Sequence, residues 1–214
     1  MTASDAPIRF FDLESQQALI RDRVEARFRT ILDHGKYIGG PEVEEMETRL
    51  AAHAGVAECI AVGSGTQALV MPMIALGYGY GDAVFLPAFT YNATANAILL
   101  AGATPVFVDI DPETFNICPD DLERRILQVK ARRDLRARAI VPVDLYGAPA
   151  DYDRINAIAA AYGLTVIADA AQAYGGAQNG VKIGALAPIT GTSFYPTKTL
   201  GGYGDGGAIF VTDK

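Results

Sequence analysis

One lysine near the end of the chain is the residue best suited to covalent chemistry. Lys198 is the only charged side chain in the aromatic-rich run 192–201. A lysine in a poorly solvated pocket loses its proton more easily, and the free amine can form a Schiff base with a carbonyl and later move a proton. The alternative is a solvated loop lysine, so the surrounding residues must separate the two interpretations.

An aspartate stands upstream of this lysine, where an apolar run ends. Residues 166–173 read VIADAAQA, which places Asp169 at the end of a predicted strand. A carboxylate beside a pyridine nitrogen keeps that nitrogen protonated, and a protonated ring draws electrons from a substrate that loses a proton. Lys198 and Asp169 together therefore suit pyridoxal 5'-phosphate, whose aldehyde needs an amine and whose ring nitrogen needs an anion.

A Gly-rich turn between a strand and a helix supplies a third component, an anion site. Residues 58–62 form a predicted strand, and residues 63–69, GSGTQAL, open a helix with apolar positions at helical spacing. Free backbone N–H groups at a helix start favour phosphate. Gly65 permits close backbone approach, and the Thr66 hydroxyl can add a hydrogen bond. An ordinary Gly-rich connection without a ligand is the alternative.

The same turn also matches Gly-x-Gly-x-x-Ala, the dinucleotide-binding fingerprint. That fingerprint needs an acidic residue at the end of the next strand to hold a ribose hydroxyl. Here the predicted strand 83–86 runs into PAFTY, residues 87–91, which contain no carboxylate. The sequence therefore favours pyridoxal phosphate over a nicotinamide dinucleotide.

Ordered sequence blocks that cover nearly the whole chain carry a family resemblance. They lie at 11–13, 35–43, 64–66, 90–97, 102–109, 169–173 and 193–198. In this order they resemble the DegT/DnrJ-type sugar aminotransferases, which are pyridoxal-phosphate enzymes of the aspartate aminotransferase fold (fold type I). Some members carry histidine at the lysine position and are not aminotransferases, whereas this chain keeps the lysine.

The resemblance implies roles for five further residues. Gly65 and Thr66 bind the cofactor phosphate, and Ser193 adds a hydroxyl to the same group. Tyr91 stacks on the pyridine ring, and Gln172 bonds the ring hydroxyl. Taken singly, the tyrosine could be a core aromatic, the serine a strand-end hydroxyl and the glutamine a helix-surface amide, but their joint order favours the cofactor site.

The resemblance also implies an activity. It is the transfer of an amino group from glutamate to a nucleotide-linked keto-sugar. The Lys198 block together with GDGG at 204–207 is most similar to enzymes that aminate position 3 of a UDP-N-acetyl-3-oxo-hexosaminuronate in the biosynthesis of surface polysaccharides such as lipopolysaccharide. Amination at position 4 of a deoxy-keto-sugar nucleotide stays open, as does a non-catalytic sensor or regulatory protein that keeps the fold.

Composition excludes several other classes. The 214 residues carry a formal charge of −7 and no basic surface signature, which argues against nucleic acid as a partner. The two cysteines, Cys59 and Cys118, lack the spacing of a disulfide framework or metal site, and His34 and His53 suggest no metal cluster. Neither a signal peptide nor a membrane-spanning run is visible, so we expect a cytoplasmic protein without a metal.

The order of predicted elements indicates an α/β fold. After two amphipathic N-terminal helices, predicted strands at 58–62, 83–86, 104–109, 139–145, 164–168 and 207–212 alternate with predicted helices near 66–76, 93–101, 119–129 and 151–162. This alternation predicts a mainly parallel sheet covered by helices on both faces, with the last strand antiparallel or at an edge. Because no repeat or linker is visible, we expect one domain over residues 1–214.

The last residue of the chain, Lys214, follows the final predicted strand closely. Members of the family that it resembles are much longer. The resemblance therefore implies a pyridoxal-phosphate-binding large domain from which the C-terminal small domain is absent. It also implies that the full-length protein is a homodimer with the active site at the interface.

Overall fold

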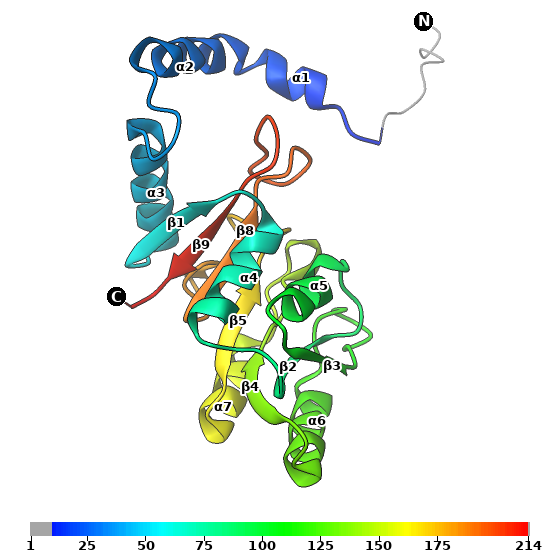
Figure 1. Cartoon of the computed structure of the whole chain (residues 1–214). Helices are drawn as coiled ribbons and strands as arrows, with labels where there is room; N and C mark the ends of the chain where they lie inside the picture. Colours follow the sequence, from blue (N-terminus) through cyan, green and yellow to red (C-terminus); the bar gives the residue numbers. More distant parts are fainter. Residues whose placement is uncertain (1–9, 214) are drawn as a thin grey trace, which may run out of the picture. The chain divides into compact units, whose positions relative to one another are not determined.

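The structure is a computed structural model that describes residues 10–213 (Figure 1). The chain divides into two compact units, and the boundary in the sequence lies between Glu45 and Met46. The single domain predicted for residues 1–214 stays a prediction. Among the described residues, no helix is long and apolar enough to cross a membrane.

The N-terminal unit is helical. It contains α1 (Leu13–Ala18), α2 (Arg21–His34) and the first residues of α3 (Pro41–Ala54). The Asp12 side chain caps α1 by accepting the Ser15 N–H, and α2 ends at Gly35 in the left-handed conformation that glycine tolerates. Neither α1 nor α2 buries a side chain within the described chain.

The second unit is built on a seven-stranded sheet. Its strands are β1 (Glu58–Val62), β2 (Asp82–Pro87), β3 (Thr104–Val108), β4 (Arg136–Ile140), β5 (Thr165–Asp169), β8 (Ile189–Ser193) and β9 (Gly207–Val211), and a small hairpin pairs β6 (Ala177–Gln178) with β7 (Val181–Lys182). The order across the sheet is β1-β9-β8-β5-β4-β2-β3. β9 is antiparallel to both of its neighbours, and the other strands of this sheet share one direction. The mainly parallel sheet is confirmed, although β9 lies inside the sheet and β1 forms the edge.

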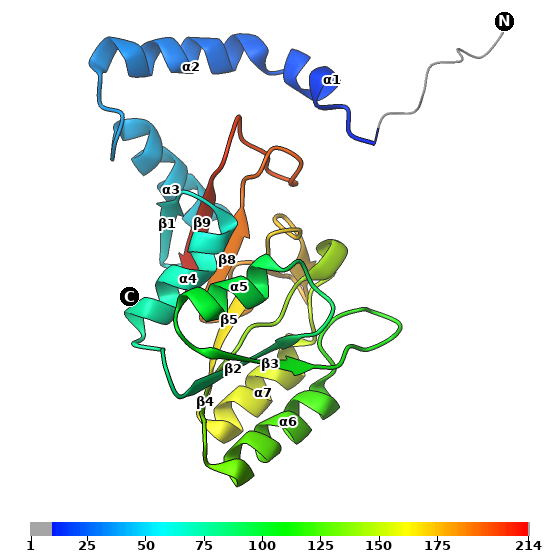
Figure 2. The same cartoon turned by 45° about the vertical axis from the view of Figure 1, so that its right-hand side comes forward.

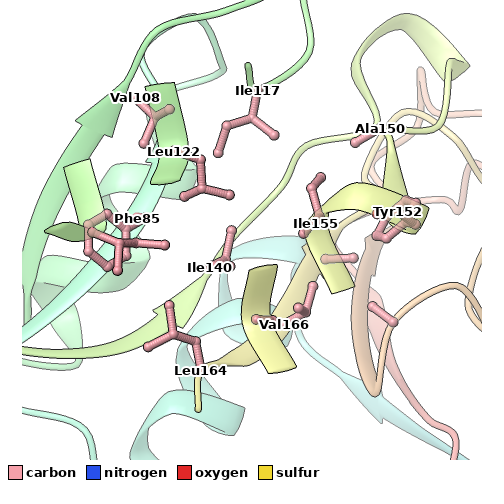
Figure 3. Close-up of a cluster of buried hydrophobic side chains, with 14 of the residues drawn as sticks. Phe85, Val108, Ile117, Leu122, Ile140, Ala150, Tyr152, Ile155, Leu164 and Val166 are labelled. Atoms are coloured by element: carbon pink, nitrogen blue, oxygen red, sulfur yellow. The ribbon is translucent and has the colours of Figure 1, made fainter. Parts of the chain in front are cut away.

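Helices cover both faces of the sheet, as predicted. On one face lie α4 (Gly65–Ala75) and α5 (Ala93–Leu100), and on the other lie α6 (Pro119–Arg132) and α7 (Tyr152–Tyr162) (Figures 1 and 2). Side chains alternate between the faces along β2. Val84 and Leu86 join the core under α4 and α5, whereas Phe85 joins the core under α6 and α7 that Figure 3 shows. Both faces of the central strands are therefore buried.

One predicted strand has different bounds in the structure, and the prediction missed β8. The strand expected at 139–145 is β4, which runs from Arg136 to Ile140. Its start was missed because two exposed arginines, which pair with Asp82, interrupt the apolar pattern there. The buried strand β8 was not predicted at all, since its sequence ITGTS has little apolar pattern. A Cβ on Gly191 would lie 3.1 Å from the Ala68 carbonyl oxygen, so the small residue permits α4 to pack closely.

Candidate active site

The carboxyl ends of the parallel strands meet along one edge of the sheet, and the predicted site residues gather there. Asp169 and Ser193 are the last residues of β5 and β8, while α4 and α5 begin after β1 and β2. One cavity of about 490 Å³ lies at this edge. Its lining includes every residue predicted for the site, namely Gly65, Thr66, Tyr91, Asp169, Gln172, Ser193 and Lys198. This position is the usual ligand crevice of an open α/β sheet.

The start of α4 presents unpaired backbone donors to this cavity. Ser64 caps the helix because its Oγ accepts the Gln67 N–H at 3.2 Å. In return, Gln67 Oε1 accepts the Gly63 N–H at 2.8 Å. The N–H groups of Gly65 and Thr66 have no acceptor within the helix, so they remain to bind an anion.

Gly65 brings the end of β8 against this helix start. A Cβ at residue 65 would lie 2.7 Å from Ser193 Cβ and 3.2 Å from Ser193 Oγ. Any larger residue would therefore push the serine away. Ser193 Oγ accepts the Tyr195 N–H at 3.2 Å, and this bond leaves its own hydrogen to donate. Two backbone donors and one hydroxyl thus converge at the helix start.

Asp169 is a buried carboxylate held by two donors. Its Oδ2 accepts the Thr94 hydroxyl at 2.7 Å, and its Oδ1 accepts the Ala171 N–H at 3.2 Å. Burial raises the pKa of Asp169, and these hydrogen bonds, together with the charge of Lys198, act to lower it. The sequence reasoning did not single out Thr94, because its partner is 75 positions away.

A second buried carboxyl, Asp144, lies beside Asp169 and was also missed. Its backbone N–H donates to the Asp169 carbonyl at 3.0 Å. Its Oδ1 accepts the Ala150 N–H at 3.0 Å and the Tyr152 hydroxyl at 2.9 Å. Oδ2 is buried and has no hydrogen-bond partner among the described residues. Burial raises the pKa of Asp144 to about 7.

Gln172 is oriented by the backbone of a neighbouring loop. Its Oε1 accepts the Tyr146 N–H at 2.8 Å. Because the oxygen is engaged there, the amide nitrogen is the end that can donate to a ligand oxygen. Tyr146 holds this geometry at φ 56°, in the left-handed region that few non-glycine residues occupy.

Tyr91 and Lys198 lie on segments that follow strands. Tyr91 precedes α5, and 72 % of it is exposed, so its ring is open to a stacking partner. Lys198 is only partly exposed. Its backbone N–H donates to the Tyr195 carbonyl at 2.8 Å in a tight turn. Both line the same cavity as Asp169. The structure therefore brings together the residues that the sequence predicted to act together.

These features fit a phosphorylated pyridine aldehyde. The helix start offers donors for a phosphate, and the absence of a Cβ at Gly65 keeps the Ser193 hydroxyl beside them. Asp169 offers a buried anion and Lys198 an amine in the same cavity. In the part of the chain that the structure describes, no group of three His, Cys, Asp or Glu side chains is placed to hold a metal ion.

Comparison with known proteins settles the family. The DegT/DnrJ/EryC1/StrS aminotransferase family model matches residues 18–214. The chain belongs to this family. Members of the DegT/DnrJ/EryC1/StrS family depend on pyridoxal phosphate, which confirms the cofactor that Lys198 and Asp169 predicted.

Three similar proteins are informative. The UDP-2-acetamido-2-deoxy-3-oxo-D-glucuronate aminotransferase of Pseudomonas aeruginosa is 50% identical over 206 residues, which make up 96% of this chain and 55% of that protein. A DegT DnrJ EryC1 StrS aminotransferase from Brucella abortus has a crystal structure with a TM-score of 0.94, 47% identity, and coverage of 97% of this chain and 56% of that one. NtdA from Bacillus subtilis, solved with bound cofactor PMP, has a TM-score of 0.86, 35% identity, and coverage of 99% of this chain and 46% of that one. The chain thus spans about half the length of these family members.

Proposed function

We propose that this chain carries the cofactor site of an aminotransferase that moves an amino group from glutamate to a nucleotide-linked keto-sugar. The observation that carries the proposal is the gathering of Lys198, Asp169 and the donors at the start of α4 in one cavity. Membership of the DegT/DnrJ/EryC1/StrS family supports it.

In this proposal each lining residue binds one part of pyridoxal phosphate. The N–H groups of Gly65 and Thr66 and the Ser193 hydroxyl would hold the phosphate. The Tyr91 ring would stack on the pyridine ring and fix its plane. The amide nitrogen of Gln172 would donate to the ring hydroxyl, since its oxygen is occupied by Tyr146.

The remaining two residues handle protons. When bound, pyridoxal phosphate supplies an aldehyde that captures an amino group and a ring that draws electrons from the adjacent carbon. The Asp169 carboxylate would hold the proton on the ring nitrogen. The Lys198 amine would take the proton from the carbon that carries the amino group of the donor and would deliver it to the carbon on the other side of that nitrogen. Because both side chains line one cavity, one bound cofactor could reach Asp169 with its ring nitrogen and Lys198 with its reacting carbon.

For the acceptor, we propose a UDP-linked N-acetyl-3-oxo-hexosaminuronate that is aminated at position 3 for surface-polysaccharide synthesis. The support is the 50% identity to the Pseudomonas aeruginosa protein named for such a substrate.

We also propose a homodimer with the site at the subunit interface. Exposed aromatic side chains beside the cavity, such as Tyr91 and Tyr195, are the kind of surface that a partner covers.

A glutamate half-reaction tests this function. Added glutamate should convert the visible absorbance of the bound cofactor to that of its amine form and release one 2-oxoglutarate per site. A panel of keto-sugar nucleotides should then restore the first spectrum, fastest with the 3-oxo-uronate and more slowly with a 4-keto-deoxysugar. A non-catalytic sensor would bind cofactor and show no spectral change, and that result would refute the proposal.

Borohydride reduction tests the role of Lys198 separately. Reduction should attach the cofactor covalently to the peptide that contains Lys198, and Lys198→Arg should abolish the labelling. Recovery of the label on Lys182, which lies on the hairpin strand β7, would show that the assignment of the reactive amine is wrong.

A further inference from the structure

A short chain of hydroxyl groups leads to the buried carboxylate at the centre of the site. Thr94 is fully buried in α5, and its Oγ1 lies 2.7 Å from Asp169 Oδ2. Thr90, on the segment before α5, places its Oγ1 2.9 Å from Thr94 Oγ1. The two threonines and the aspartate therefore form one continuous hydrogen-bonded line from the cavity wall to the end of β5.

Counting hydrogens fixes the direction of this line. An ionised carboxylate only accepts, and a threonine hydroxyl has one hydrogen to donate. Since Thr94 gives its hydrogen to Asp169, the hydrogen between the two threonines must come from Thr90. Both hydroxyl dipoles then point toward the carboxylate, and each strengthens the other in a buried environment.

Asp169 needs this support because its surroundings oppose a negative charge. Burial raises the pKa of Asp169. Its neighbours Asp144 and Tyr152 are a carboxyl and a phenol, and neither carries a positive charge that would stabilise the ionised carboxylate. Lys198, from the loop after β8, is the cation that acts on it. The lysine must also exchange its proton during the proposed reaction, so its charge is not constant. Thr94 is a donor whose contribution does not vary with that proton.

We infer that Thr94 is a positioning residue for Asp169: its hydroxyl, oriented by Thr90, keeps the carboxylate ionised and fixes its rotation at the end of β5. The inference rests on the proposed role of Asp169 as the partner of the ring nitrogen. Thr94 acts only through Asp169, and no covalent bond changes in the process.

Three variants separate this role from simple packing. Thr94→Val keeps the branched shape but removes the hydroxyl, and Thr94→Ser keeps the hydroxyl. Thr192→Val is the matched control, because Thr192 is equally buried on β8 and its hydroxyl donates to the Ala170 carbonyl at 3.1 Å, next to Asp169 but not to its carboxylate. Circular dichroism of each variant checks that it folds.

The first measurement uses protein without cofactor. The pKa of the Asp169 carboxyl is followed by carbon NMR or infrared difference spectroscopy, with Asp169→Asn to assign the signal. Thr94→Val should raise the proton affinity of Asp169 by about tenfold or more, because a charge-assisted hydrogen bond to the ionised form is lost. Thr94→Ser should stay close to the parent, and Thr192→Val should not shift the pKa.

The second measurement uses the holoprotein. Thr94→Val should lower kcat of the glutamate half-reaction about tenfold with little change in KM. It should also shift the pH profile of kcat to higher pH, because the pKa of Asp169 rises. If Thr94→Val does not fold, Thr90→Val removes the outer donor alone and should produce a smaller rise in the same pKa.

Two results would overturn the inference. One is an Asp169 pKa in Thr94→Val that matches the Thr192→Val control, and the other is a serine variant that fails to restore the parent value. The failure of the proposed function is distinguishable from both. In that case the parent protein itself would show no half-reaction, while the pKa shift in cofactor-free protein would still be present.

Discussion

Asp169 is the residue whose charge matters most to the proposed chemistry. In Asp169→Asn the amide cannot hold a proton on the ring nitrogen, so the cofactor should still bind while the glutamate half-reaction slows at least about 100-fold. That loss corresponds to ~3 kcal/mol in the activation barrier. Stopped-flow absorbance measures it, and a rate within about threefold of the parent would exclude this role.

Asp144 gives the protein a stability that depends on pH. Its pKa is raised from 3.8 to about 7 in the fold. Between these values the folded chain holds a proton that the unfolded chain releases, so the contribution of Asp144 to stability is greatest below pH 3.8 and is lost as pH rises toward 7. The slope from this one group is up to ~1.4 kcal/mol per pH unit in the free energy of unfolding.

Asp144→Asn removes that titration because asparagine resembles the protonated form at every pH. Relative to the parent, the variant should therefore gain stability steadily as pH rises from about 4.5 to 7. Urea unfolding at a series of pH values measures the difference. Asp111→Asn is a control of opposite sign, since N–H groups of Glu113 and Thr114 lower the pKa of Asp111. A parallel pH dependence in parent and Asp144→Asn would contradict the assignment.

At the scale of elements, we expect the contact between α4 and β8 to decide how tightly the proposed cofactor phosphate is held. In Gly65→Ala the new Cβ would meet Ser193 Cβ at 2.7 Å, and one of the two backbones must move. We expect the affinity for pyridoxal phosphate to fall about tenfold, which is ~1.4 kcal/mol. Alanine also favours a helix by up to ~1 kcal/mol, so affinity rather than unfolding is the decisive measurement.

Gly204→Ala is the matched control for this change. Gly204 lies on the loop before β9, and a Cβ there would meet nothing within 4 Å. Fluorescence titration of cofactor-free protein with pyridoxal phosphate, and separately with inorganic phosphate, should show weaker binding for Gly65→Ala alone. Equal affinities in the two variants would mean that the approach of β8 to α4 does not shape the site.

Most of the helices and strands of the second unit could be predicted from the sequence. Alternating apolar runs and helical periods predicted the parallel sheet and its helical covers, because burial on both faces leaves a strong pattern. The sequence did not predict β8 because this strand is rich in threonine and glycine. Its burial depends on the close approach of α4 rather than on apolar side chains. In the site, the motif residues could be found from the sequence. Thr94 and Asp144 could not, because the fold alone brings them to their hydrogen-bond partner Asp169.

At the scale of the whole molecule, we expect a dimer. Two exposed aromatic residues, Tyr91 and Tyr195, line the cavity. Light scattering should give twice the chain mass for the protein that performs the half-reaction, and dilution should reduce mass and activity together. A monodisperse monomer with full activity would contradict both the dimer and the shared site.

The insertion of β9 between β1 and β8 sets the order in which the seven-stranded sheet can be completed during synthesis. In the described sheet β1 pairs only with β9, although β9 begins at Gly207, near the opposite end of the chain. Gly207 also packs against Ser64, which caps α4. On the ribosome, β1 must therefore wait unpaired until β9 emerges. The start of α4, which this sequence encodes before most of the sheet, therefore takes its final surroundings only after β9 has formed.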